Sequence, residues 1–193
     1  MDAGLPGIMT PSDEKAEDST IKWYQQAIGS LLYATMQTRP DISYAISMLS
    51  RYCSNPGVEH LKALDRLFRY IKGSLDLGIY FQRDSDDEII EWTDADYDSV
   101  IDGRKSTGGY MFMFNGGPIS WAAKRQIAVA LSSTESEYMA MTEAAKEAVW
   151  LHRLGVELKI RNDNQPMLLN ADNQGAIALC TNPEFHRRTK HIW

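Results

Sequence analysis

The chain has 193 residues, 44% hydrophobic and 24% charged, which fits one soluble globular domain, or a small domain with an appendage, and excludes wholesale disorder. No apolar run reaches the roughly 18 residues of a membrane helix and no secretory leader is visible, so we expect an intracellular protein without a membrane partner. The net charge of -6 would normally argue against a nucleic-acid partner, but acidic residues gather at the N-terminus and the last stretch is basic, so global charge decides little.

The sequence of residues 1–74 predicts a flexible N-terminal segment followed by helices. Residues 1–21 carry five acidic side chains against one lysine and show no periodicity, which is typical of a flexible segment. Residues 22–74 have apolar positions at helical spacing and predict a small helical module. Its three helices are expected at about 24–36, 42–52 and 61–73. The third also has a basic stripe of Lys62, Arg66 and Arg69, which fits either a phosphate-backbone contact or a plain solvated face.

From residue 75 the apolar residues follow a period of two, and the sequence predicts an α/β domain over residues 75–193. Strands are expected at 78–81, 89–94, 110–114, 119–122 and 167–171, and helices at 134–154 and 175–180. Counted from residue 89, the order is β-β-β-α-β-α.

Two aspartates close predicted strands. Strand alternation places Asp94 on the same face as Ile90 and Trp92, and a carboxylate on an apolar face is costly unless something pairs with it. Asp172 ends the last strand in the same way. The carboxyl ends of strands are where α/β sheets bind ligands, so both positions are candidates for a site.

A third carboxylate, Glu137, lies in the first turn of the long helix. Met141, Ala144 and Ala148 follow it at helical spacing, which places Glu137 on the core-facing stripe. Taken singly, an Asp or Glu is more often a cap or a surface charge. If the strands are neighbours, however, the three carboxylates converge and require a cation. Oxygen ligands without His or Cys favour Mg²⁺ or Mn²⁺, and two such ions about 4 Å apart would support phosphodiester cleavage.

Around these residues the sequence resembles the ribonuclease H region of copia-type LTR retrotransposon Pol polyproteins. The motifs that carry the resemblance are WTDADY at 92–97, RKSTGGY at 104–110, ISW at 119–121, ALSSTESEY at 130–138, ADNQ at 171–174 and HRRTKHI at 186–192. Upstream, IGSLLY at 28–33, TRPDI at 38–42 and YIKG at 70–73 resemble the segment that follows the reverse-transcriptase palm in the same polyproteins.

The resemblance implies an RNase H-like mixed sheet and metal-dependent endonucleolytic cleavage of the RNA strand of RNA–DNA hybrids. The family's first three active-site carboxylates fall on Asp94, Glu137 and Asp172, with Asp96 as an accessory ligand. Mg²⁺ or Mn²⁺, as two ions, would be the cofactor, and no small-molecule cofactor is expected. The implied partners are an RNA–DNA hybrid, recognised by its 2′-hydroxyls and groove shape, and the reverse-transcriptase palm of the same polyprotein.

Several further residues are candidates for nucleic-acid contacts, each with a structural alternative. Basic or polar side chains next to the motifs fit a hybrid interface, but they also fit solvated turns, helix caps and a surface loop. The candidates are Lys62, Arg66, Arg69, Arg104, Lys105, Ser133, Asn173, Arg187, Arg188 and Lys190.

The sequence departs from the family at its end. Trp193 stands where the family continues with an aspartate, and the family's last strand and C-terminal helix, with the fourth carboxylate, are missing. No polymerase motif is present, because Ser85-Asp86-Asp87 lacks the required aromatic pattern. The alternative is therefore a catalytically inactive truncated relic that at most binds a nucleic-acid duplex. Another RNase H-like nuclease, such as an integrase, is less favoured because the carboxylates lie within these motifs.

Overall fold

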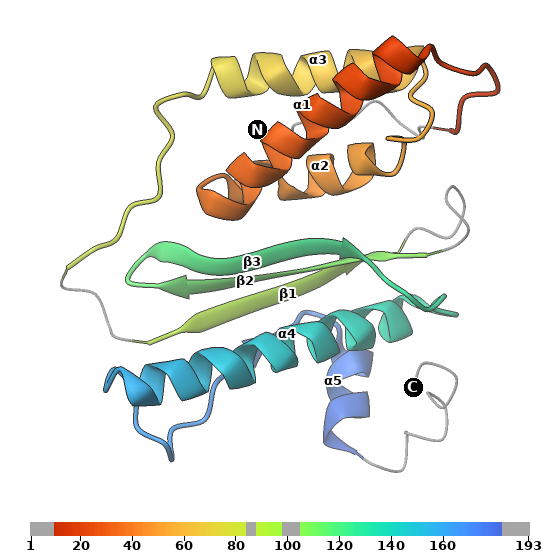
Figure 1. The fold of residues 1–193 in the computed structure, drawn as a ribbon. Coiled ribbons are helices and arrows are strands. Elements are labelled where there is room, and N and C mark those ends of the chain that lie inside the picture. The colour runs from red at the N-terminus through yellow and green to blue at the C-terminus, as the bar shows by residue number, and fades with distance from the viewer. Residues whose placement is uncertain (1–9, 84–87, 98–104, 183–193) are drawn as a thin grey trace. The chain divides into compact units, whose positions relative to one another are not determined.

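The computed structural model describes residues 10–83, 88–97 and 105–182. The chain forms two compact units, Met1–Ile79 and Tyr80–Trp193 (Figure 1). Within the described ranges, no helix has the length and apolar character needed to cross a membrane.

The first unit is helical. It contains α1 (Asp18–Gln37), the 3₁₀ turn η1 (Pro40–Ile42), α2 (Ser43–Ser50) and α3 (Val58–Lys72). The apolar stripes pack into one core, whose most buried members include Tyr24, Ile28, Ile42, Ile46, Leu49 and Leu64. The three predicted helices are therefore confirmed.

Helix α1 begins at Asp18, six residues before the expected start at Tyr24. An acidic first turn suits the positive end of the helix dipole, so the acidic composition of this stretch favours an earlier start. The residues just before it are also held. Asn55 accepts a hydrogen bond from the Ala16 amide at 2.8 Å, and its Nδ2 donates to the carbonyls of Ser12 and Glu14, each at 3.1 Å.

The second unit is an α/β unit with a mixed sheet, and the order β-β-β-α-β-α predicted from residue 89 is confirmed (Figure 1). Its elements are β1 (Ile90–Asp96), β2 (Thr107–Phe114), β3 (Gly117–Arg125), α4 (Ser133–Glu157), β4 (Leu169–Asn170) and α5 (Gln174–Thr181). The described strands form one sheet in the order β3-β2-β1-β4. Strand β1 pairs antiparallel with β2 and parallel with β4. Asn115 and Gly116, both at positive φ, make the tight β2–β3 turn.

The strand expected at 78–81 is wrong, because these residues have no regular structure. The following residue makes a hydrogen bond to the β2–β3 turn instead of a ladder, with the Gln82 amide donating to the Asn115 carbonyl at 2.7 Å. Strand-forming side chains do not make a strand without a partner edge.

Strand β4 has two residues where five were expected. It pairs with β1 only through Glu91–Leu169 and Trp92–Asn170. The segment before it is held as a loop by Arg161, whose guanidinium donates to the Pro166 carbonyl at 3.0 Å.

Helix α4 packs on one face of the sheet, and the core there includes Ile89, Phe112, Ala148 and Leu151. Because Glu91 lies opposite Phe112 in the β1–β2 register, this face of β1 carries Glu91 rather than its neighbours. Ile90 and Trp92 are 45% and 60% exposed. The interpretation of the Ile90, Trp92 and Asp94 side as the buried side of the strand is therefore wrong.

Candidate metal centre

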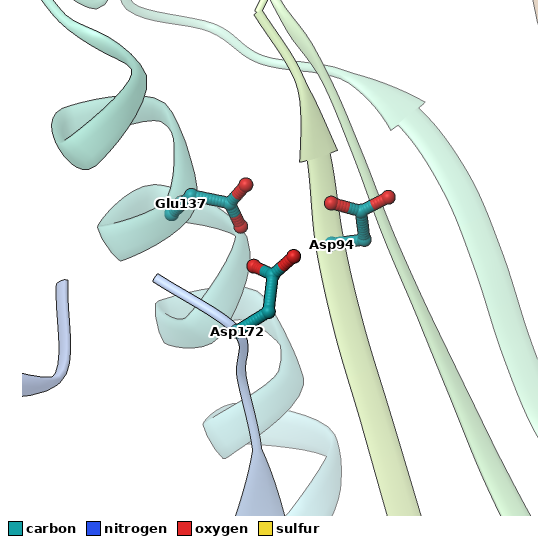
Figure 2. Close-up of side chains that lie close together, drawn as sticks. All are labelled: Asp94, Glu137 and Asp172. Carbon is teal, nitrogen blue, oxygen red and sulfur yellow. The ribbon is translucent and has the colours of Figure 1, made fainter. Parts of the chain in front are cut away.

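Three carboxylates gather where β1, α4 and the segment after β4 meet. Asp94, Glu137 and Asp172 each offer an oxygen, and these oxygens lie within 4.8 Å of one another (Figure 2). They are separated by more than forty and more than thirty positions in the sequence, so the fold alone brings them together. These are the three residues that the sequence selects from strand ends and from the start of the long helix.

Asp94 lies beyond the point where β4 stops pairing. Its partner on β2 is Gly109, whereas the β1–β4 ladder ends at Trp92. The edge of β1 that pairs with β4 is therefore open at Asp94, and the Asp94 carboxylate is exposed. The Ala95 amide donates to Asp94 Oδ1 at 2.8 Å, which fixes the orientation of the carboxylate.

Glu137 is placed by the start of α4. Ser132 caps the helix by accepting from the Glu135 amide at 3.2 Å, and Glu135 accepts in return from the Leu131 amide at 2.7 Å. Gln126, just after β3, donates through Nε2 to the Ser136 carbonyl at 2.8 Å and ties the helix start to the sheet. Glu137 is buried, together with the whole expected stripe of Met141, Ala144 and Ala148.

Asp172 lies between β4 and α5. The next residue, Asn173, is the N-cap of α5 and accepts from the Ala176 amide at 3.0 Å. A Cβ at Gly175 would lie 3.0 Å from the side chain of Thr134, so the start of α5 packs closely on the start of α4. The residues that follow Asp172 thus fix it between two capped helices.

The electrostatics of the group favour a cation. Burial raises the pKa of the Glu137 carboxyl to about 7, and the charges of Asp94 and Asp172 act in the same direction. Glu137 Oε2 is buried and has no hydrogen-bond partner among the described residues. Asp94 and Asp172 are exposed, which leaves the group open on one side. An all-oxygen donor set of this kind fits Mg²⁺ or Mn²⁺.

None of the other predicted site residues that the structure describes is a member of this carboxylate group. Asp96 is exposed on β1 and is not a member of the carboxylate group. Lys105 is half-buried beside the start of β2, and Ser133 is the exposed first residue of α4. Asn173 Oδ1 is engaged in the α5 cap. Arg104, Arg187, Arg188 and Lys190 lie outside the described residues.

The predicted basic stripe lies on α3 in the first unit. Lys62 pairs with Glu59 at 3.5 Å and Arg69 with Asp65 at 2.9 Å, and all four side chains are exposed. Arg66 is exposed on the same helix. The stripe is therefore interleaved with acidic residues, which weakens its attraction for phosphate.

One residue of the second unit was missed in the sequence. Glu91 is completely buried on the α4 side of β1, and burial raises its pKa to about 7. Strand alternation from the buried Ile89 would have placed it inside, but the more apolar Ile90 and Trp92 indicated the opposite face.

The chain is similar to several curated proteins. The retrovirus-related Pol polyprotein from transposon TNT 1-94 of Nicotiana tabacum is 44% identical over 183 residues, which are 95% of this chain and 14% of that protein. The corresponding polyprotein from transposon RE1 of Arabidopsis thaliana is 40% identical over 190 residues, 98% of this chain and 13% of that protein. Secreted RxLR effector protein 161 of Plasmopara viticola is 44% identical over 128 residues, 66% of this chain and 90% of that protein.

No protein-family model and no solved structure matches the chain. The chain spans about one seventh of the length of the Pol polyproteins that it matches.

Proposed function

We propose that this chain is part of a retrovirus-related Pol polyprotein of a transposon and acts as its ribonuclease H, cleaving the RNA strand of an RNA–DNA hybrid. The observation that carries the proposal is the convergence of Asp94, Glu137 and Asp172 within 4.8 Å. The motifs around these three residues, which resemble the ribonuclease H region of copia-type elements, support it independently. The α/β unit with its mixed sheet is compatible with an RNase H-like fold.

Asp94, Glu137 and Asp172 would hold Mg²⁺ or Mn²⁺, as two ions. When bound, such ions supply an activated water and stabilise the leaving oxygen of a phosphodiester. The buried Glu137 carboxyl faces two other carboxylates, so it would be a ligand only when deprotonated, and the cation would favour that state. The two exposed aspartates leave the open side of the group to the substrate.

The hybrid would contact the rim of this group. Ser133 begins the helix that carries Glu137, and Asn173 follows Asp172, so both residues are near the proposed metals in the chain. An amide or hydroxyl there suits a sugar 2′-hydroxyl or a phosphate. Lys105, Arg104, Arg187 and Arg188 would add phosphate contacts. The palm of the same polyprotein would be the neighbouring domain.

The test is cleavage of a hybrid with a labelled RNA strand, using the full chain with Mg²⁺ or Mn²⁺. We expect Asp94→Asn to lower the rate roughly a hundredfold to a thousandfold, because it removes a metal ligand. Glu88→Gln is the matched control: it neutralises an exposed carboxylate just before β1, outside the carboxylate group, and we expect it to retain activity. A folded wild-type chain that leaves the RNA strand intact with either metal would contradict the proposal and favour the inactive relic.

A further inference from the structure

Glu91 is a completely buried carboxyl that the proposed reaction does not use. It lies on the α4 side of β1, opposite Phe112 of the core. One oxygen, Oε1, has no hydrogen-bond partner among the described residues. Burying a carboxyl in an apolar environment is costly, and an apolar side chain of this size would suit the position better if packing were its only role.

The other oxygen joins two strands. Glu91 Oε2 accepts from the Asn170 amide at 3.1 Å, and Asn170 Nδ2 donates to the Glu91 carbonyl at 2.7 Å. Because β4 pairs with β1 through only two residues, these side-chain hydrogen bonds are a large part of what holds β4 in place.

One of the three carboxylates, Asp172, follows just after β4. Asn170 lies two residues before Asp172, and the Asp172 oxygen must stay within 4.8 Å of those of Asp94 and Glu137. We propose that Glu91 is a positioning residue, which ties β4 to β1 and thereby holds Asp172 in the carboxylate group. This inference rests on the metal site of the proposed function. Replacing a residue that orients a metal ligand without itself binding the metal lowers metal affinity by roughly ten- to a hundredfold.

Two substitutions separate the tether from simple packing. Glu91→Met keeps the length of the side chain and suits the buried site, but removes both acceptor oxygens. Glu91→Gln keeps an acceptor for the Asn170 amide. Glu88→Gln, at an exposed position just before β1, is the control for a change of charge alone. Asn170→Ala is an independent second test, because it removes the reverse hydrogen bond without changing Glu91.

Each variant of the full chain is examined by hydrogen exchange of the Asn170 amide and by Mn²⁺ titration followed by electron paramagnetic resonance. Protection of the Phe112 amide reports whether the core has folded. We expect Glu91→Met to speed exchange at Asn170 and to weaken Mn²⁺ binding about tenfold with Phe112 still protected. Asn170→Ala should weaken Mn²⁺ binding to a smaller extent. Glu91→Gln and Glu88→Gln should behave like the wild type.

The outcomes separate this inference from the proposed function. Unchanged exchange at Asn170 in Glu91→Met overturns the tether, whatever the metal does. Faster exchange with unchanged Mn²⁺ affinity overturns the positioning of Asp172. A wild-type chain that binds no Mn²⁺ overturns the metal site itself, and with it the positioning role. The exchange rates at Asn170 still show whether Glu91 holds β4 against β1. If Glu91→Met fails to fold, Mn²⁺ affinity in Asn170→Ala equal to that of the wild type overturns the inference.

Discussion

Asp41 in the first unit and Glu137 in the second are carboxylates partly or wholly removed from water, and their neighbours differ in charge. Arg39 donates to both oxygens of Asp41, at 2.9 and 2.7 Å, and the Tyr70 hydroxyl donates to Oδ2 at 2.9 Å. Burial alone would raise the pKa of Asp41, but these hydrogen bonds and the Arg39 charge outweigh it and leave the pKa below its ordinary value.

Around Glu137 the balance is reversed. Burial raises its pKa to about 7, and the charges that act most strongly on it, those of Asp94 and Asp172, are both negative. The first arrangement is complete without a ligand and needs no function beyond joining η1 to the end of α3. The second is incomplete within the described residues. This difference distinguishes a structural charge cluster from the proposed cation site.

The largest expected effect comes from making Glu137 neutral. Glu137→Gln should lower hybrid cleavage roughly a hundredfold or more, because it removes one of the three proposed metal ligands. The same change should raise the free energy of unfolding of the second unit above pH 7 without metal, because it removes a carboxylate that is repelled by two others. Cleavage rates and urea denaturation at pH 8 measure the two effects. A variant that loses both activity and stability would show that Glu137 is structural.

The charge cluster of the first unit should respond in the opposite way. Arg39→Met leaves Asp41 without its cation and also removes the hydrogen bonds to Ser74, so we expect the first unit to lose about 2 kcal/mol of stability. Arg69→Met is the matched control, because its pair with Asp65 is exposed, and it should cost less than about 0.5 kcal/mol. Urea unfolding followed at the Leu49 amide reports on this unit. Equal losses of stability in Arg39→Met and Arg69→Met would show that the Arg39–Asp41 cluster stabilises the unit no more than an exposed ion pair does.

The helices and the candidate carboxylates could be predicted from the sequence for a physical reason. Helix stripes such as the one through Ile42, Ile46 and Leu49 are set by local spacing, and a helix satisfies its own backbone. Asp172 and Glu137 were found because polar residues interrupt apolar patterns at the ends of elements. These signals depend on neighbours in the chain.

What could not be predicted depends on partners that are distant in the chain. Residues 78–81 have strand-forming side chains, but none of the four described strands pairs with them. The buried face of β1 is decided by the side on which α4 packs, and the exposed Ile90 and Trp92 gave the wrong answer. Glu91 therefore escaped notice, although its role follows directly once Asn170 is seen beside it.

The smallest expected effect is a difference in pH dependence between the two units. The folded pKa of Glu91 is about 7, above its ordinary value of 4.5, so protonated Glu91 favours folding. Its contribution to stability is present below about pH 4.5 and is lost as the pH rises toward 7. Asp41 has a lowered pKa, so its contribution is present above its ordinary pKa of 3.8 and is lost as the pH falls below it.

Between pH 5 and 7.5 the stability of the second unit should therefore fall by about 1 kcal/mol or more on account of Glu91, whereas Asp41 should add almost no slope to the first unit. Glu91→Gln should flatten this part of the stability profile of the second unit and leave the profile of the first unit unchanged. Urea unfolding at the two pH values, followed at the amides of Phe112 and Leu49, measures both units in one sample. Glu137 titrates in the same range and leaves a residual slope in Glu91→Gln, so the decisive quantity is the difference from the wild type. A profile as steep in Glu91→Gln as in the wild type would mean that Glu91 is already ionised in the folded chain at pH 5, and that the tether to Asn170 is made by a buried charge.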